Sequence, residues 1–239
     1  MLRRQPVLRM MRFAGRFWQL HHETKETLFG YGNPVARSFH KATILLLDYG
    51  KRVLVCGDGN LSYSASIAKR MKERGAHLTA TVLESQQEHE RVYEHSVDNV
   101  NLIQSLGHDV HYEVDATCLM ERYHDDEKFD LIQFNFPHWR GKTNARRNRR
   151  LLHDFFQASL RILTPNGHVV TALMNHQGGA FASNIQEWKQ SWLPAQYAAK
   201  CGLLLTRVKP FEPAYQLSSY RGEDRTFDIR GEPQLYVFA

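Results

Sequence analysis

The sequence predicts an α/β fold, in which a mainly parallel, doubly wound sheet is flanked by crossover helices. Short apolar runs of strand length alternate with segments whose apolar residues recur at helical spacing. The first apolar run ends in a glycine-rich turn that opens a helical segment, which is the order of a crossover unit. At 239 residues, the chain has room for one such domain and an extension.

The individual elements follow from these runs. Apolar runs predict five strands for the parallel part, at 52–56, 78–83, 110–114, 129–136 and 168–174. Helical spacing predicts helices at 64–74, 87–106, 151–163, 183–192 and 195–201. A turn is expected over 164–167, where proline and glycine stand together. Two final strands, at 203–208 and 234–238, are joined by a long loop, and we expect them to pair antiparallel.

Composition narrows the functional class. The formal net charge is +6 and the isoelectric point is near 9.3, which favours an acidic partner, with nucleic acid first. The alternative is a basic protein whose charges are scattered over its surface. No apolar run approaches the length of a membrane span, so no membrane association is expected. Cys56, Cys118 and Cys201 form no CxxC pair, which predicts neither a disulfide framework nor a metal site and suits a reducing compartment.

The first 41 residues form a separate region in this interpretation, and the folded domain covers 42–239. Five arginines precede the first acidic residue, Glu23, and apolar residues are interspersed among them: Arg3, Arg4, Arg9, Arg12 and Arg16. This composition is typical of a mitochondrial targeting segment, so we expect a mitochondrial protein, with a nucleolar or cytoplasmic location as the alternative. The same segment could instead be a basic arm that binds RNA or a partner. Gly30, Gly32, Asn33 and Pro34 indicate a linker after it.

The turn after the first strand suggests a bound nucleotide. Its residues are Gly57, Asp58, Gly59, Asn60, Leu61 and Ser62. Glycines there let the backbone approach a ligand, although a tight strand-to-helix turn needs them too. Ser62 replaces the third glycine of the dinucleotide fingerprint, which disfavours NAD. Glu84 follows the second strand and could accept both ribose hydroxyls, and Asp115 follows the third strand and could accept from an adenine amino group. Together they predict an adenosine-containing ligand.

The fourth strand ends in Asn135, Phe136, Pro137 and His138. Such a cluster resembles the Asn-Pro-Pro-Tyr loop of methyltransferases that modify planar nitrogens. Proline fixes the loop, the amide orients the edge of a base, and an aromatic ring can stack on it. The alternative is a strand that merely ends at a proline.

These motifs together resemble the family of large-subunit ribosomal RNA (uridine-N3) methyltransferases. The resemblance covers Lys51 to Phe238 and is carried by Gly57–Ser64, Glu84-Ser85, Asp115–Thr117, Phe129–His138 and the Asn148–Phe156 helix. Leu61 stands where phenylalanine is usual, Glu84 where aspartate is common, and Gln216–Arg221 only loosely matches a Pro-Gly-Tyr stretch.

The resemblance implies a Rossmann-like S-adenosylmethionine (SAM)-dependent methyltransferase fold, with SAM as cofactor and ribosomal RNA as substrate. It implies cofactor contacts from Gly57, Asp58, Gly59, Asn60, Ser62, Glu84, Asp115 and Asn135, and catalysis at Asn135, Phe136, Pro137 and His138. Methyl transfer from a sulfonium needs alignment and removal of a proton, and no metal. His138 could be the base or could orient it, and Phe136 could stack on the target or belong to the core.

A basic segment follows the target-base loop, with Arg140, Lys142, Arg146, Arg147, Arg149 and Arg150. We expect it to bind RNA phosphates, because cations at a helix N-terminus oppose the helix dipole unless an outside anion is present. The alternative is a solvated helix start.

Two other functions compete with an RNA methyltransferase. One is an RNA-binding factor in ribosome assembly, associated with assembly intermediates and their proteins, in which methyl transfer is weak or lost. The other is a NAD-dependent oxidoreductase, which Ser62 and the Asn135–His138 loop disfavour.

Overall fold

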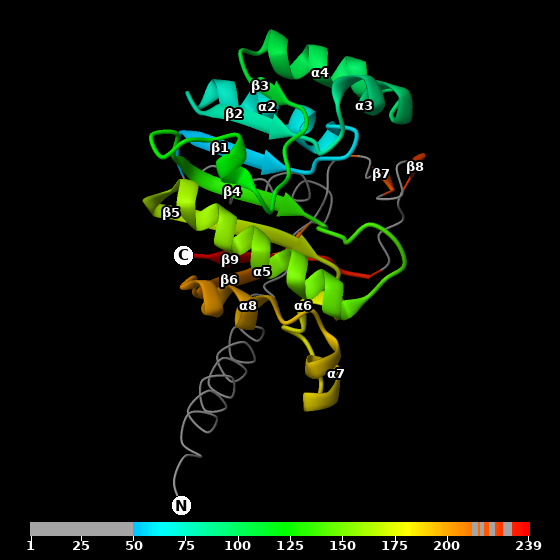
Figure 1. Ribbon diagram of the computed structural model, residues 1–239, viewed down its shortest axis with the longest axis vertical. Coiled ribbons are helices and arrows are strands. Elements are labelled where there is room, and N and C mark those ends of the chain that lie inside the picture. Colours follow the sequence, from blue (N-terminus) through cyan, green and yellow to red (C-terminus); the bar gives the residue numbers. More distant parts are fainter. Residues whose placement is uncertain (1–49, 212–214, 216–217, 220–222, 227–230) are drawn as a thin grey trace, which may run out of the picture. The chain divides into compact units, whose positions relative to one another are not determined.

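The structure is a computed structural model that describes residues 50–211, 215, 218–219, 223–226 and 231–239. Its centre is a seven-stranded sheet in the order β3-β2-β1-β4-β5-β9-β6 (Figure 1). The strands are β1 (Arg52–Cys56), β2 (His77–Thr81), β3 (Asp109–His111), β4 (Phe129–Asn135), β5 (Leu163–Leu173), β6 (Leu205–Pro210) and β9 (Gln234–Phe238). The pairs from β3 through β5 are parallel, and β9 runs antiparallel between β5 and β6. The predicted Rossmann-like fold and its antiparallel C-terminal pair are confirmed.

Strand β1 shows how the sheet is buried on both faces. Val53 and Val55 belong to one apolar cluster, and Leu54 and Cys56 belong to the other, since successive side chains of a strand point to opposite faces. Helices α2 (Ser62–Glu73) and α4 (Ser96–Ser105) contribute to the first cluster, and α5 (Ala145–Ile162) and α8 (Pro194–Cys201) to the second. Burial on both faces explains why β1 is a continuous apolar run in the sequence.

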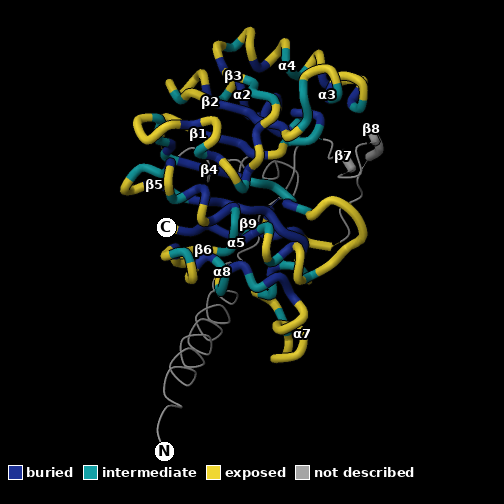
Figure 2. The backbone as a smooth tube through the Cα atoms, viewed as in Figure 1, coloured by how far each residue is buried: buried dark blue, intermediate teal, exposed yellow. Residues whose placement is uncertain are grey.

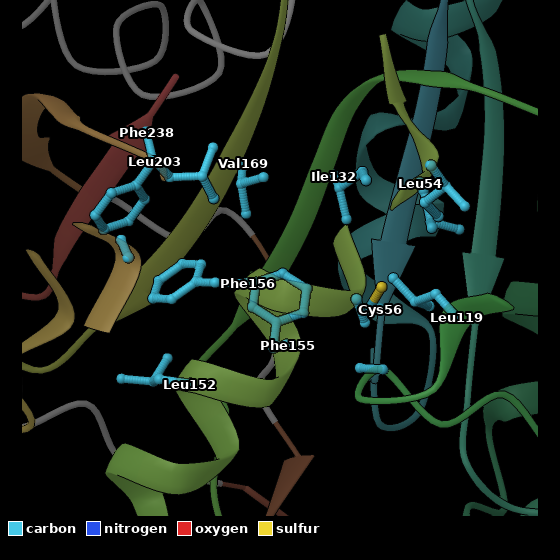
Figure 3. Packing of buried hydrophobic residues seen from close by; sticks show 14 of the residues in the cluster. Leu54, Cys56, Leu119, Ile132, Leu152, Phe155, Phe156, Val169, Leu203 and Phe238 are labelled. Atoms are coloured by element: carbon cyan, nitrogen blue, oxygen red, sulfur yellow. The ribbon is translucent and has the colours of Figure 1, made fainter. Parts of the chain in front are cut away.

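Helix α5 supplies the largest side chains of the second cluster. Phe155 and Phe156 are fully buried between α5 and the sheet, where Phe156 lies 4.8 Å from the Phe238 ring, centroid to centroid (Figure 3). Phe155 meets Phe134 of β4 edge-on at 5.3 Å. These contacts fix α5 against β4 and β9, and therefore fix the N-terminus of α5 beside the loop that follows β4 (Figure 1).

The remaining helices are short. They are α3 (Gln86–Val92), the 3-10 turn η2 (Leu119–Glu121), α6 (Asn175–Gly178) and α7 (Ile185–Gln190). Strands β7 (Ser218–Ser219) and β8 (Glu223–Thr226) pair antiparallel between β6 and β9 in the chain. Within the described residues, no helix is both long and apolar enough to cross a membrane. None of the three cysteines forms a disulfide.

Two predicted elements are wrong in detail. The sequence predicts one helix over 87–106, but the structure has α3 and α4, separated where Tyr93 turns out of helical geometry, at φ −117° and ψ 90°. Tyr93 is buried, and its ring lies 5.0 Å from that of His89, one helical turn earlier, so an apolar residue at helical spacing stands at the break. The predicted turn at 164–167 lies inside β5, where the pairing jumps from Phe129↔Leu163 to Leu131↔His168. The predicted linker and the Gln216–Arg221 stretch lie wholly or largely outside the described residues.

Candidate active site at the carboxyl edge of the sheet

The predicted site residues follow four neighbouring parallel strands. The segments after β3, β2 and β1 carry Asp115, Glu84 and the Gly57–Ser62 turn, and Asn135 is the last residue of β4, in the order of the strands across the sheet. In Figure 1 the arrowheads of β1, β2 and β4 point to the same side of the sheet. The fold therefore brings to one edge groups that lie up to 78 residues apart in the chain, as expected for ligand binding in an open α/β sheet.

The glycine turn has the backbone that its residues require. Gly57 has φ +58°, and a Cβ there would lie 2.6 Å from the Phe134 ring, so a larger residue would clash. Gly59 has φ +29°, and Leu61 also lies in the left-handed region at φ +65° while its side chain is fully buried. The buried side chain of Leu61 thus anchors the turn in the core, and the backbone of Gly57 to Asn60 lies at the end of β1.

Two side chains that the sequence did not single out fix the carbonyls of this turn. His89 of α3 contacts the Gly59 carbonyl through Nε2 at 2.7 Å, and Asn99 of α4 donates to the Asn60 carbonyl at 2.8 Å. Burial lowers the pKa of His89, although the bond to Gly59 opposes this, so the neutral ring donates from Nε2. In the sequence, His89 and Asn99 could have been recognised only if the break between α3 and α4 were visible. The regular helical spacing over 87–106 hides that break.

Asp58 connects the turn to the start of α2. Its Oδ2 accepts from the Ser64 N–H at 2.7 Å, and its carbonyl accepts from the Leu61 N–H. Burial raises the pKa of Asp58 to about 7, and hydrogen bonds from Ser64 and Tyr63 partly oppose the shift. A carboxylate at a helix N-terminus is a favourable arrangement, so this residue supports the turn whether or not it contacts a ligand.

Glu84 lines an open cleft together with residues of the basic segment. The cleft has a volume of ≈ 1050 Å³ and is lined by Leu83, Glu84, Ser85, Glu88, Arg91, Val92, Glu113, Arg140, Gly141 and Lys142. Arg140 pairs with Glu84 at 3.1 Å, between an exposed guanidinium and a mostly buried carboxylate. Arg140, expected at an RNA phosphate, therefore contacts the carboxylate expected at a ribose.

Asp115 follows Glu113, which lines this cleft, and Asp115 shapes its own loop. Its Oδ1 accepts from the N–H and the hydroxyl of Thr117, at 2.8 and 2.7 Å. Backbone bonds from Glu113 to Glu84 and from Val114 to Val82 continue the pairing beyond the ends of β3 and β2. These bonds hold the loops of Asp115 and Glu84 side by side. Oδ2 of Asp115 remains available as an acceptor for a ligand amino group.

Asn135 belongs to a buried polar cluster at the end of β4. Its Oδ1 accepts from Gln133 Nε2 at 2.6 Å. Burial raises the pKa of Tyr63, and the neighbouring amides of Gln133 and Asn135 lower it. Tyr215 lies 5.0 Å from Tyr63, ring to ring. The hydroxyls of both tyrosines, Gln133 Oε1 and Asn135 Nδ2 are buried beside one another, and their mutual contacts are too loose for well-formed hydrogen bonds. Buried polar groups are rarely left so, which indicates hydrogen-bonding capacity for a ligand or for water at this point.

The rest of the target-base loop is firmly packed. Phe136 has φ +48°, and its ring meets Phe211 edge-on at 5.6 Å, which favours a core role over stacking on a base. Pro137 is buried. His138 Nδ1 lies 2.5 Å from the Trp139 carbonyl, and its Nε2 is 3.5 Å from the Thr143 hydroxyl. Because Nδ1 must donate to that carbonyl, the neutral ring has Nε2 as its acceptor nitrogen.

The predicted RNA-binding cations divide into two groups. Arg149 donates to the carbonyls of Ser191 and Lys189, so it fixes the end of α7 to α5. Arg150 pairs with Asp154. Lys142, Arg146 and Arg147 make no ion pair with the described residues, and Figure 2 shows the loop before α5 exposed. Helix α5 starts at Ala145 without an acidic residue in its first turn, so the expected conflict with the helix dipole is present.

Asp130, a residue of the matched Phe129–His138 motif, lies at the opposite end of β4. Burial alone would raise the pKa of Asp130, but the N–H groups of Arg52 and Lys51 and the Thr164 hydroxyl hold it below its ordinary value. Asp130 thus ties the start of β1 to β4 and takes no part in the site. In the part of the chain that the structure describes, no three His, Cys, Asp or Glu side chains are placed to hold a metal.

The shifted pKa of Asp58 predicts a pH dependence of stability. A carboxyl whose pKa rises from 3.8 to about 7 on folding contributes stability that is full below pH 3.8 and is lost as the pH rises through 7. Between pH 5 and pH 8 the free energy of unfolding should therefore fall by up to about 3 kcal/mol more in the wild type than in Asp58→Asn. Urea unfolding of both proteins at several pH values measures this difference.

Asp130→Asn is the matched control, because the pKa of Asp130 is lowered instead. The contribution of Asp130 is present above pH 3.8 and lost only below it, so this variant should parallel the wild type between pH 5 and pH 8. Parallel curves for the wild type and Asp58→Asn in the same range would show that Asp58 titrates normally.

Comparisons with known proteins agree with this geometry. Residues 54–222 match the family described as rRNA (uridine-N3-)-methyltransferase BTM5-like. The chain is 35% identical over 187 residues to the Homo sapiens protein named ferredoxin-fold anticodon-binding domain-containing protein 1, covering 76% of this chain and 30% of that protein. The chain thus spans less than a third of this relative.

Solved structures show the same fold. A SAM-dependent methyltransferase from Aquifex aeolicus is similar with a TM-score of 0.51 and 12% identity, covering 83% of this chain and 88% of that one. TrmN from Thermus thermophilus has a TM-score of 0.50 and 17% identity, covering 83% of this chain and 47% of that one. With a family match over most of the chain and a methyltransferase fold around the site, the chain belongs to the BMT5-like family of rRNA (uridine-N3) methyltransferases.

Proposed function

We propose that the chain is a SAM-dependent methyltransferase that modifies N3 of a uridine in ribosomal RNA. One observation carries the proposal: the glycine turn, Glu84, Asp115 and Asn135 follow four adjacent parallel strands and meet at one edge of the sheet. That edge offers a close backbone approach, two carboxylates and an amide, in the order in which an adenosine-containing donor and a planar acceptor would need them.

The residues present fit SAM. A Cβ on Gly57 would meet the Phe134 ring, so this position of the turn requires a glycine. The bare backbone of a glycine can also lie close to a ligand. Glu84 lines a cleft that its ion pair with Arg140 does not fill, and a carboxylate there can accept from two ribose hydroxyls. Asp115 retains one carboxylate oxygen for an adenine amino group. Gly57, Asp58, Gly59, Asn60 and Ser62 supply the turn in this proposal, although Asp58 points its carboxylate at α2.

When bound, SAM supplies a methyl group on a sulfonium, which is reactive without further activation. The chain must then position the uracil and take up its N3 proton. Asn135 lies where an amide can bind the edge of the base, and its Nδ2 is a buried donor whose contacts with the Tyr63 and Tyr215 hydroxyls are loose. His138 has Nε2 as an acceptor when neutral, so it is the candidate base within the loop. Phe136 and Pro137 hold this loop in place from the core side.

A second candidate is the RNA-binding assembly factor in which methyl transfer is weak or lost. Such a factor could have its cofactor cleft closed by side chains. The cleft beside Glu84 is open, which favours the enzyme at this one cofactor residue, although the glycine turn, Asp115 and Asn135 do not line that cleft. In either function the partner would be ribosomal RNA, in assembly intermediates that also contain proteins.

The location in the cell is part of the proposal, with residues 1–41 as a mitochondrial targeting segment. The support is the arginine-rich, acid-free composition of the first 22 residues. A fluorescent reporter fused to this segment should enter mitochondria, and a reporter with the arginines of the segment changed to glutamine should not. A cytosolic reporter combined with import of the full chain would place the signal elsewhere, and a nucleolar full chain would support the alternative location.

Loss of the Asn135 amide should slow methyl transfer. We expect Asn135→Ala to lower kcat by about 100-fold, the usual effect of removing one oriented donor from a reaction site. Purified ribosomal RNA and SAM are the reactants, and 3-methyluridine is quantified by mass spectrometry of the nucleosides. Asn101→Ala is the control, since Asn101 is exposed on α4 and should be neutral. SAM binding without any methylated uridine in the wild type would reject the enzyme in favour of the factor.

Loss of the Glu84 carboxylate should weaken SAM binding. Glu84→Ala removes a charged hydrogen-bond acceptor. We expect the binding free energy of SAM to weaken by about 1–3 kcal/mol, which lowers the affinity roughly 5- to 150-fold. Glu88→Ala is the matched control, because Glu88 lines the same cleft but pairs with Arg91. Isothermal calorimetry gives both affinities. If Glu84→Ala binds SAM as the wild type does, Glu84 does not hold the ribose.

A further inference from the structure

Trp139 is an exposed aromatic residue whose backbone is held by hydrogen bonds. It directly follows the Asn135–His138 loop, and 37% of its surface is exposed. Its N–H donates to Oδ1 of Asn148, a fully buried residue of α5, at 2.7 Å. Its carbonyl accepts from His138 Nδ1 at 2.5 Å. Because both backbone groups are bonded, the position of Trp139 is set by α5 and by the candidate catalytic loop.

A cation lies against the indole ring. The guanidinium carbon of Arg147 is 4.3 Å from the ring centroid, within the range of a cation–π contact. Arg147 stands in the first turn of α5, where its N–H donates to the Asn144 cap. Its guanidinium is exposed, so N–H donors remain available to an anion while the plane stays on the ring.

The surroundings decide what the ring and the cation would bind. No acidic residue occurs between Asp130 and Asp154, a stretch that contains six lysines and arginines. Arg140, Lys142 and Arg146 flank Trp139 and Arg147 within it. A flat, half-exposed ring beside cations suits a ligand with both a π-face and a negative charge, and a nucleotide has both. A protein partner with an apolar side chain would leave Lys142, Arg146 and Arg147 without a counter-charge.

We propose that Trp139 and Arg147 form a binding site for an unpaired nucleotide of the RNA, adjacent to the uridine at the catalytic loop. The base stacks on the indole, and its phosphate contacts the guanidinium. The nucleotide is unpaired because a base within a duplex is stacked on its neighbours and cannot offer its face to a side chain. This inference rests on the proposed RNA function and assigns a second nucleotide to the same site.

Two oligonucleotides of equal charge separate stacking from electrostatics. The probes are a fluorescein-labelled oligouridine of about 12 nucleotides and an abasic ribose-phosphate strand of the same length. The wild type should prefer the oligouridine. Trp139→Ala should reduce this preference by roughly 5- to 100-fold, because stacking of one base on an aromatic ring is lost. Trp139→Phe should retain most of it. Fluorescence anisotropy at fixed salt measures each affinity.

Two further variants serve as controls. Trp188→Ala removes another half-exposed tryptophan, on α7, and should leave the base preference unchanged. The double variant Lys142→Gln/Arg146→Gln should keep the preference but reduce the slope of log affinity against log salt by about 1.4, since each lost phosphate contact contributes about 0.7 on a single strand.

The outcomes distinguish a failure of the Trp139 site from a failure of the proposed RNA methyltransferase function. If the wild type methylates ribosomal RNA while Trp139→Ala keeps the full preference for oligouridine, the Trp139 site is wrong and the proposed function stands. If the wild type binds neither oligonucleotide and methylates no RNA, the RNA function fails, and the Trp139 site fails with it. A loss of preference in Trp139→Ala with normal methylation of a minimal uridine substrate supports the second nucleotide.

Discussion

Parallel hydrogen bonding of β1 with β2 on one side and with β4 on the other is the constraint on which the site depends. The register places Val55 opposite both Ala80 and Gln133, so the three strands end at nearly the same level. Every loop that leaves these ends must emerge at one edge of the sheet. The sheet therefore brings together side chains that are remote in the chain, and contacts such as the Arg140–Glu84 pair follow from this arrangement. The two apolar clusters, one on each face, hold the strands in that register.

Backbone strain is concentrated at the same edge. Among the described residues, four non-glycine residues have φ in the left-handed region, and three of them stand in loops after parallel strands: Leu61, Glu113 and Phe136. Each such conformation costs roughly 1–3 kcal/mol and persists only where its surroundings over-determine it. Leu61 is fully buried, Glu113 donates to the Glu84 carbonyl, and the Phe136 N–H donates to the Ala172 carbonyl at 2.9 Å. Packing thus keeps three loops in shapes that the chain alone would leave, as expected at a preorganised site.

The sequence predicts what depends on local pattern and fails where tertiary partners decide. Strand β1 and its glycine turn are predictable because an apolar run and two glycines define them. The break after α3 falls at Tyr93, a buried residue that fits the helical spacing, so the pattern of apolar residues does not mark it. His89 and Asn99 support the turn through side-chain bonds to its carbonyls, and such partners look like ordinary polar helix residues in a sequence. The predicted turn at 164–167 lies inside β5, because the pairing of β4 with β5 shifts register there, and such a shift depends on the partner strand.

The charged residues at the start of α5 show most clearly the difference between what a local pattern predicts and what tertiary partners decide. A sequence displays six cations in eleven residues as one basic segment, whereas the fold gives them different roles. Arg149 fixes α7, Arg150 pairs along its own helix, and Arg140 reaches the carboxylate of Glu84. Arg146 and Arg147 stand in the first turn, where the helix dipole disfavours each by a few tenths to about 1 kcal/mol. Their side chains could be replaced by carboxylates with a gain in helix stability, so their presence beside the target-base loop is best explained by an anion that the described part of the chain does not provide.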